Sequence, residues 1–174
     1  GMFYDLQDVR GYDSLFPAQY ARYMGWIEPQ NELLYNRIAP FTQFASLDSP
    51  LTDLLNVKYI ITEEEIPLPK YSLVYQDQSV RIYENLGVVP RAFTLPVQAT
   101  LVAPNVESIG EIIQQHDPRF YAIVEQDFTA NIPYALDAPT PATLQAQTIR
   151  DYQRNEVLIE TTVAPGTTEQ VAYP

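Results

Sequence analysis

Short runs of β-branched and aromatic residues, each closed by proline or polar residues, limit what this chain can fold into. VKYIIT at 57–62 and FYAIVE at 120–125 have the composition of strands, and the first is expected to be buried. YSLVY at 71–75 and SVRIYE at 79–84 flank three polar residues, which predicts a β-hairpin. PRAFTLPV at 90–97 is expected to be extended, and its prolines favour an edge or interrupted strand.

Three segments have the spacing and the start signals of helices. Apolar residues recur at helical spacing over 14–27, and Asp13 or Ser14 is a suitable N-cap. The segment 49–56 begins with a serine cap followed by proline. Its expected apolar stripe consists of Leu51, Leu54 and Leu55. A third helix is predicted over 105–116, where an asparagine is the cap and a glutamate lies in the first turn.

Together these elements predict an α+β fold. We expect a mixed or antiparallel sheet of about five short strands with three flanking helices. This domain is expected to span 1–137, because prolines mark 130–141 as a linker. Two further strand-like runs, TLQAQTIRDY and EVLIETTVA, would begin a second, β-rich module over 138–174. We expect that this module is truncated and that the chain is a piece of a longer protein.

Composition excludes several kinds of site and partner. The 174 residues carry a formal net charge of −12, and the ten lysines and arginines are scattered. Nucleic acid and anionic membrane surfaces are therefore not expected partners. The absence of cysteine excludes disulfides, zinc–thiolate sites and cysteine nucleophiles. No apolar run approaches the ~20 residues of a membrane span. The thirteen tyrosines fit either a binding surface or a sheet core.

The stretch DVRGYDSLFPAQY at 8–20 holds the main candidate site. Polar residues lie close to Gly11 in the sequence on both sides, and one further aspartate lies upstream. These residues are Asp5, Asp8, Arg10, Tyr12 and Asp13. Paired carboxylates can perform acid–base work on a glycosidic bond. The alternative is structural. Asp13 would then cap a helix, Gly11 would permit the preceding turn, and Asp8 would pair with Arg10 or Arg22.

Two other polar features are expected to be structural. His116 is the only histidine and falls at a predicted helix C-terminus, where the helix dipole favours it. Glu63, Glu64 and Glu65 could supply oxygen ligands to a hard cation, but their spacing matches no EF-hand pattern, so a solvated loop is favoured. No metal, cofactor or catalytic residue is assigned.

Four blocks occur in an order that resembles the bacterial YfhO-like membrane proteins, which are polytopic and of the GT-C glycosyltransferase type. The blocks are DLQDVRGYDSLFPAQYARYM, LLNVKYIIT, VRIYENLGVVPRAF and FYAIVEQD. The resemblance runs from about residue 3 to residue 160. It implies a C-terminal extracytoplasmic segment that follows many membrane helices. It also implies a lipid-linked sugar donor, an envelope acceptor, and catalytic carboxylates in the membrane portion rather than in this chain.

The expected function is therefore a non-catalytic domain that helps position the donor or the acceptor, with the parent's transmembrane helices as partners. Asp8, Arg10, Tyr12 and Asp13 are the candidate ligand contacts, since arginine suits a pyrophosphate. Three alternatives stay open. One is an envelope carbohydrate-binding module that uses tyrosines and Trp26. Another is a small glycoside hydrolase built on the Asp5, Asp8 and Asp13 cluster. The third is a domain that only stabilises its parent.

Overall fold

A computed structural model describes residues 7–9, 17–29, 41–125, 139–153, 156–162 and 169–172. The chain packs as two compact units, Gly1–Val88 and Val89–Pro174. The boundary predicted from the sequence falls instead between residues 137 and 138. That point lies outside the described residues, so the division into 1–137 and 138–174 stays a prediction.

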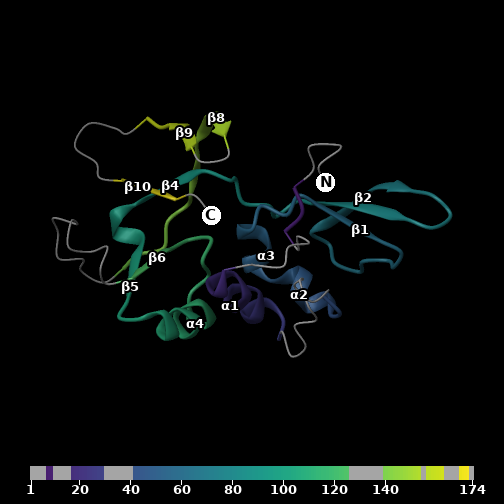
Figure 1. The fold of residues 1–174 in the computed structure, drawn as a ribbon, viewed down its shortest axis with the longest axis horizontal. Coiled ribbons are helices and arrows are strands. Elements are labelled where there is room, and N and C mark those ends of the chain that lie inside the picture. The colour runs from purple at the N-terminus through teal and green to yellow at the C-terminus, as the bar shows by residue number, and fades with distance from the viewer. Residues whose placement is uncertain are drawn as a thin grey trace. The chain divides into compact units, whose positions relative to one another are not determined.

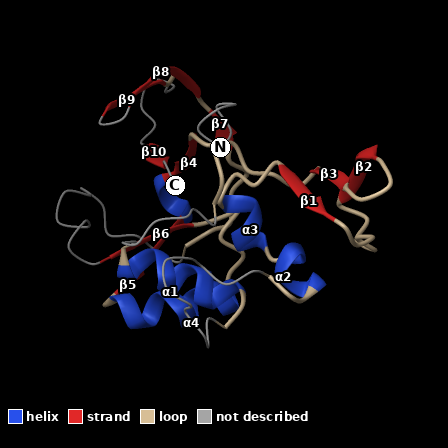
Figure 2. Ribbon diagram, turned by 45° about the vertical axis from the view of Figure 1, so that its right-hand side comes forward, coloured by secondary structure: helices blue, strands red, loops and turns tan. Residues whose placement is uncertain are grey.

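The α+β class is confirmed. Three helices precede the strands, α4 (Val106–Gln115) lies between β5 (Thr100–Ala103) and β6 (Ala122–Glu125), and the strands of the described residues form four small sheets of two or three strands each (Figure 1). Figure 2 separates the two kinds of element by colour. Short strands are what the proline-bounded runs predicted.

The first unit begins with the helices α1 (Ala18–Ile27), α2 (Phe44–Asp48) and α3 (Pro50–Leu54). The start of α1 differs from the prediction. Its N-cap is Pro17, which has an extended ψ of 139° and makes no side-chain cap bond. Proline has no N–H to donate and a fixed φ, so it readily precedes a first turn. Asp13 and Ser14, the predicted caps, lie outside the described residues.

The predicted start of α3 is confirmed, and its predicted apolar stripe is wrong in part. Ser49 Oγ accepts a hydrogen bond from the N–H of Leu51 at 3.2 Å, and proline occupies the first helical position. The buried residues are Leu51, Thr52 and Asp53, whereas Leu54 is only half-buried. The helix ends at Leu54 and Leu55 is its C-cap, so the predicted stripe reaches past the last helical residue.

The first sheet consists of β1 (Tyr59–Thr62), β2 (Tyr71–Gln76) and β3 (Arg81–Asn85), in the order β1-β3-β2 with antiparallel neighbours. The predicted β2–β3 hairpin is confirmed. Ile66, Tyr71 and Tyr83 are buried and form a small core on one face of this sheet. Leu47, Ile60 and Leu68 are partly buried and pack against this core. The prediction that 57–62 is buried is wrong, because Tyr59 and Ile61 are exposed.

The second unit begins with β4 (Phe93–Pro96), the 3-10 turn η1 (Val97–Ala99) and β5 (Thr100–Ala103). Next come α4 (Val106–Gln115) and β6 (Ala122–Glu125), and β6 pairs with β5 in parallel. The predicted asparagine cap of α4 is confirmed: Asn105 Oδ1 accepts from the N–H of Ser108 at 2.9 Å, within a capping box.

The described residues of the second unit also form the short strands β7 (Gln145–Ala146), β8 (Thr148–Gln153), β9 (Glu156–Glu160) and β10 (Glu169–Ala172). β8 and β9 pair with each other in antiparallel fashion. The extended conformation predicted for 90–97 is confirmed over β4, which ends at Pro96 where the turn η1 follows, but β4 lies between β10 and β7 and is not an edge strand. Its prolines stand before the strand and at its last residue, which leaves the central N–H groups able to pair. Within the described residues, no helix is both long enough and apolar enough to cross a membrane.

Candidate functional site

Of the predicted ligand contacts, only Asp8 is among the described residues, and it is exposed. The hydroxyl of Tyr20 in α1 donates a hydrogen bond to the carbonyl of Val9, so the segment 7–9 lies against this helix. Burial, and then the nearby charge of Asp8, raise the pKa of Tyr20 and keep its hydroxyl protonated. Asp5, Arg10, Tyr12 and Asp13 lie outside the described residues, and the assembly of this cluster stays a prediction.

A buried polar cluster that the sequence analysis missed joins α3 to the first sheet. Asp53 is fully buried, and its Oδ1 lies 2.9 Å from Nζ of Lys70. The same oxygen accepts a hydrogen bond of 2.8 Å from Nδ2 of Asn85, which is also buried. We call Asp53, Lys70 and Asn85 the polar hub. A charged pair tolerates burial when further hydrogen bonds support it, and Asn85 donates such a bond to Asp53 here.

The polar hub fixes the base of the sheet. Asn85 ends β3, and its Nδ2 also donates to the carbonyl of Val57 at 3.1 Å, just before β1. Lys70 stands immediately before β2, and its carbonyl accepts from the N–H of Leu86 at 2.8 Å. Gly87 lies close to the polar hub, since a Cβ at this position would be 3.3 Å from Oδ2 of Asp53. The hub therefore holds all three strands at one end, and its carboxylate is out of reach of a ligand in solution.

A second buried carboxylate, Glu28, organises α2. Its two oxygens accept hydrogen bonds from the N–H groups of Thr42 and Gln43 at 2.9–3.4 Å, and from the hydroxyls of Thr42 and Ser46 at 2.5 Å. Burial raises the pKa of Glu28, but the hydrogen bonds from Ser46, Thr42 and Gln43 together leave it below its ordinary value. Glu28 therefore stays ionised. It accepts the hydrogen bonds at the start of α2 that an N-cap side chain would accept, because the N-cap residue Gln43 makes no side-chain cap bond.

The feature of the first unit best suited to binding is the open face of the β1-β3-β2 sheet. Strand register places two rows of side chains on this face. The row nearer the hub is Tyr59, Glu84 and Ser72, and the other row is Ile61, Ile82 and Tyr75. We call these six residues the aromatic face. Tyr59, Ile61 and Tyr75 are 51%, 66% and 51% exposed. Large exposed side chains that share one face, as these three do, are a feature of interaction sites in soluble domains.

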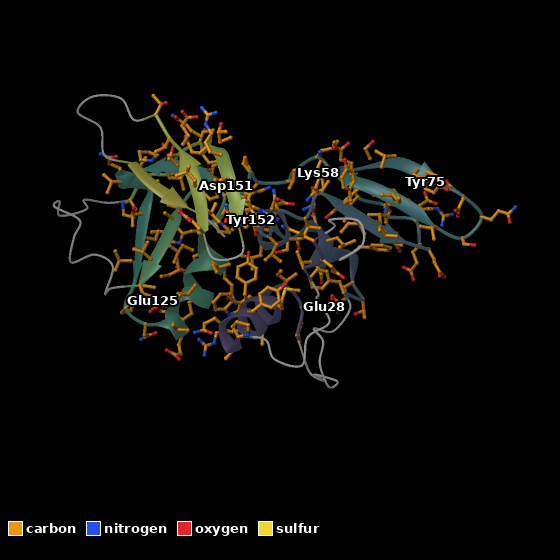
Figure 3. All side chains as sticks on the ribbon, turned by 45° about the horizontal axis from the view of Figure 1, so that its top comes forward. Glu28, Lys58, Tyr75, Glu125, Asp151 and Tyr152 are labelled. Carbon is orange, nitrogen blue, oxygen red and sulfur yellow. The ribbon has the colours of Figure 1, made fainter. Side chains whose placement is uncertain are left out.

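Charged groups border the aromatic face at both ends. Lys58 Nζ lies 3.8 Å from Oε1 of Glu84 and 5.3 Å from the ring centroid of Tyr59. At the other end, the hydroxyl of Tyr75 donates to Oδ2 of Asp77 at 3.2 Å, and this bond and the carboxylate charge raise the pKa of Tyr75. Figure 3 labels Lys58 and Tyr75 at these two ends of the sheet. The face thus combines flat aromatic surface with hydrogen-bonding groups at its borders.

The remaining candidates have structural surroundings. His116 is the C-cap of α4; its N–H donates to the carbonyl of Ile112 at 2.9 Å, and its ring meets that of Tyr121 edge-on at 5.2 Å. Glu63, Glu64 and Glu65 are exposed. Across the described part of the chain, no group of three or more histidine, aspartate or glutamate side chains is placed to hold a metal ion. Trp26 is half-buried and packs beside Tyr23 at 6.2 Å in α1, not on the aromatic face.

Comparisons with protein-family models, with curated proteins and with solved structures found no match. The resemblance noted in the sequence is therefore the only link to a family, and it supplies a hypothesis.

One signal in the sequence points to the polar hub. Asp53 lies between Leu51 and Leu54, in a segment whose apolar stripe predicts burial. A charged residue in a buried position needs a partner of opposite charge. The partner could not be named, because Lys70 lies 17 residues further along the chain. The aromatic face carried no such signal, since an exposed and a buried tyrosine look alike in sequence.

Proposed function

We propose that this chain is a non-catalytic, extracytoplasmic domain of a YfhO-like membrane glycosyltransferase, and that it helps to position an envelope glycan acceptor or a lipid-linked sugar donor. The aromatic face is the observation that carries the proposal. A pyranose ring presents C–H groups on its faces and hydroxyls at its edges. The rings of Tyr59 and Tyr75 offer flat apolar surface to the C–H groups of the sugar. Glu84, Lys58 and Asp77 offer charged hydrogen-bonding partners to its hydroxyls.

The electrostatics favour a neutral or cationic sugar chain over an anionic one. The whole chain has a formal net charge of −12, and carboxylates stand at both ends of the aromatic face. A polyanionic glycan would be repelled over a range of about 10 Å at moderate salt.

A non-catalytic role agrees with what the buried ionisable groups do. Asp53 and Glu28 are both engaged by donors of the protein itself, the first within the polar hub and the second at the start of α2. Catalytic carboxylates must instead reach the reacting atoms of a substrate. Catalysis in this proposal belongs to the membrane portion of the parent protein.

The test uses membranes that contain the full-length parent protein. The double substitution Tyr59→Ala and Tyr75→Ala removes both rings, and Leu158→Ala is the matched control, because Leu158 is comparably exposed (56%) on a strand of the other unit. Losing two stacking contacts of about 0.5–1.5 kcal/mol each, about 1–3 kcal/mol together, should raise the KM for acceptor by about 5- to 150-fold. The value of kcat should hardly change, because the lost binding is shared by ground state and transition state.

Two results would contradict the proposal. Unchanged glycosyl transfer by the double variant, at normal expression, would remove the aromatic face from function. Turnover of a lipid-linked sugar by the isolated chain would show that the domain is itself catalytic.

A further inference from the structure

Two exposed tyrosines stand on the aromatic face at a separation that strand register sets. Tyr59 of β1 pairs with Glu84 of β3, and Tyr75 of β2 pairs with Ile82, two residues away on the same central strand. Neighbouring strands lie roughly 4.8 Å apart and rise about 3.4 Å per residue, so the two tyrosine Cα atoms are separated by about 12 Å. Side chains stand roughly perpendicular to a sheet, so the rings keep a similar separation. A single pyranose does not span it.

The surface between the two rings is continuous. Ile82 and Glu84 lie on the central strand between them, and both are half-buried. Lys58 Nζ lies over the Tyr59 ring, 5.3 Å from its centroid, yet Tyr59 is still 51% exposed, as is Tyr75. The path from one ring to the other therefore crosses an apolar side chain and a carboxylate.

We propose that the aromatic face binds three consecutive sugars of an extended, neutral, β-1,4-linked glycan, with the outer two stacked on Tyr59 and Tyr75. Successive sugars of such a chain are turned over, so every second sugar presents the same face. Two linked sugars span a distance close to that between the tyrosines. The middle sugar lies over Ile82, with its hydroxyls beside Glu84. This inference rests on the proposed function and narrows it, because a face for three sugars suits an acceptor chain better than a donor that carries one sugar.

Main-chain geometry favours a glycan over a peptide as the occupant. The N–H and C=O groups of a strand point toward its neighbours in the plane of the sheet, and not out of its face. An extended peptide adds to a sheet through such groups at an edge, whereas the path between the tyrosines crosses all three strands. The C–H face of a sugar needs no main-chain partner, and its hydroxyls meet carboxylates at Glu84 and Asp77.

Charge and shape select the class of glycan. The carboxylates of Glu84 and Asp77, with the net charge of −12, repel a sugar chain that carries acidic substituents. An α-1,4-linked chain coils, so its first and third sugars do not present coplanar faces. An extended β-1,4-linked chain does present them, and the nearly flat surface of a three-stranded sheet can contact both.

Titration of the ¹⁵N-labelled chain with cello-oligosaccharides tests the length requirement, with chemical shifts of the amides as the readout. Signals of β1, β2 and β3 should move, and those of β8 and β9 should not. An open face covers only one side of the ligand, so the Kd for cellotriose should be on the order of 1 mM. Cellotriose should bind about 2- to 12-fold more tightly than cellobiose, because it reaches the second ring, and cellotetraose should add little.

Substitutions assign the contact to the two rings. Tyr59→Leu and Tyr75→Leu each lose a flat ring but keep apolar bulk, and each should weaken binding of cellotriose about 2- to 12-fold. Tyr59→Phe and Tyr75→Phe keep the rings and should bind it as the unmodified chain does. Tyr152→Leu is the matched control, because Tyr152 is 49% exposed on a strand of the other unit. Circular dichroism checks folding, and the length series on the unmodified chain needs no variant.

Several results would overturn the inference. Equal affinity for cellobiose and cellotriose would mean that the two rings do not act together. Binding of maltotriose as tight as that of cellotriose would remove the requirement for an extended chain. Leucine variants at Tyr59 and Tyr75 that bind as Tyr152→Leu does would place the contact elsewhere, and a chain that binds no cello-oligosaccharide would exclude this class of glycan.

These failures are distinguishable from failure of the proposed function. Glycosyl transfer by the full-length parent with Tyr59→Ala and Tyr75→Ala uses the parent's own acceptor, whatever its linkage. Impaired transfer by that variant, together with no preference for cellotriose, would keep the aromatic face as a glycan site and reject only the extended chain. Unchanged transfer would instead reject the proposed function itself.

Discussion

Nζ of Lys70 lies 2.9 Å from Oδ1 of Asp53, and the carboxylate is fully buried. Replacing Asp53 by alanine leaves a largely buried ammonium without its carboxylate and also removes one of the two acceptors of Asn85 Nδ2. We expect Asp53→Ala to lower the free energy of unfolding by about 3–5 kcal/mol, because an uncompensated buried charge is costly. Urea unfolding followed by circular dichroism measures this change.

A double-mutant cycle with Lys70→Met separates the ion pair from simple packing. The double variant should be less destabilised than the sum of the two single variants, since removing both partners leaves no unpaired charge. Lys58→Met is the control, because its contact with Glu84 is longer, at 3.8 Å, and exposed, so it should change stability by less than about 1 kcal/mol. A cost below 1 kcal/mol for Asp53→Ala would show that the polar hub is not a stabilising centre.

Glu28 should make the stability of the first unit depend on acid pH. Its pKa in the folded state is below the ordinary value, because the hydrogen bonds at the start of α2 outweigh burial. A depressed folded pKa contributes stability that is fully present above the unfolded pKa, near 4.3, and is lost as pH falls through the folded pKa.

The comparison that isolates this effect is Glu28→Gln, which cannot ionise. At pH 7 the unmodified chain should be the more stable of the two, and the difference should shrink between about pH 5 and pH 2. Urea unfolding at several pH values measures the free energy of unfolding of the unmodified chain and of Glu28→Gln. A difference in stability that stays constant over this range would mean that the carboxylate charge does not hold α2.

Local signals predicted the elements well, and the reasons are specific. The Ser49-Pro50 start, the Asn105 cap and the β2–β3 hairpin depend on neighbours within a few residues, and all three are present in the structure. The start of α1 was placed too early because Asp13 looked like a better cap than Pro17.

Features set by distant contacts could not be predicted. The prolines of 90–97 predict an edge or an interrupted strand, yet β4 is a central strand, because β10, more than 70 residues later in the chain, pairs with it. Tyr59 was expected inside because its neighbours are apolar, yet it is Tyr83 of β3 that faces the core. A shift of one residue in register exchanges the two faces of a strand, and sequence periodicity over four residues does not fix it.

Asn56 is the one described residue other than glycine with a positive φ, at 56°, and it follows the C-terminus of α3. Asparagine tolerates this left-handed conformation better than alanine and other residues with apolar side chains. Asn56→Ala should therefore cost about 1 kcal/mol of unfolding free energy, and Asn56→Gly should cost less than Asn56→Ala. Thermal unfolding of the two variants measures the difference. If alanine were tolerated as well as glycine, backbone strain would not be the constraint at this position.

The hydrolase alternative makes a prediction of its own about Asp8. A glycosidase needs two carboxylates, about 5 Å apart for retention or up to about 9.5 Å for inversion. Asp8 is exposed, and the hydroxyl of Tyr20 beside it donates to the carbonyl of Val9. We therefore expect the purified chain to hydrolyse aryl glycosides no faster than buffer does, and Asp8→Asn to leave that rate unchanged. Hydrolysis that disappears in both Asp8→Asn and Asp13→Asn, with folding intact, would favour the hydrolase and overturn a non-catalytic role.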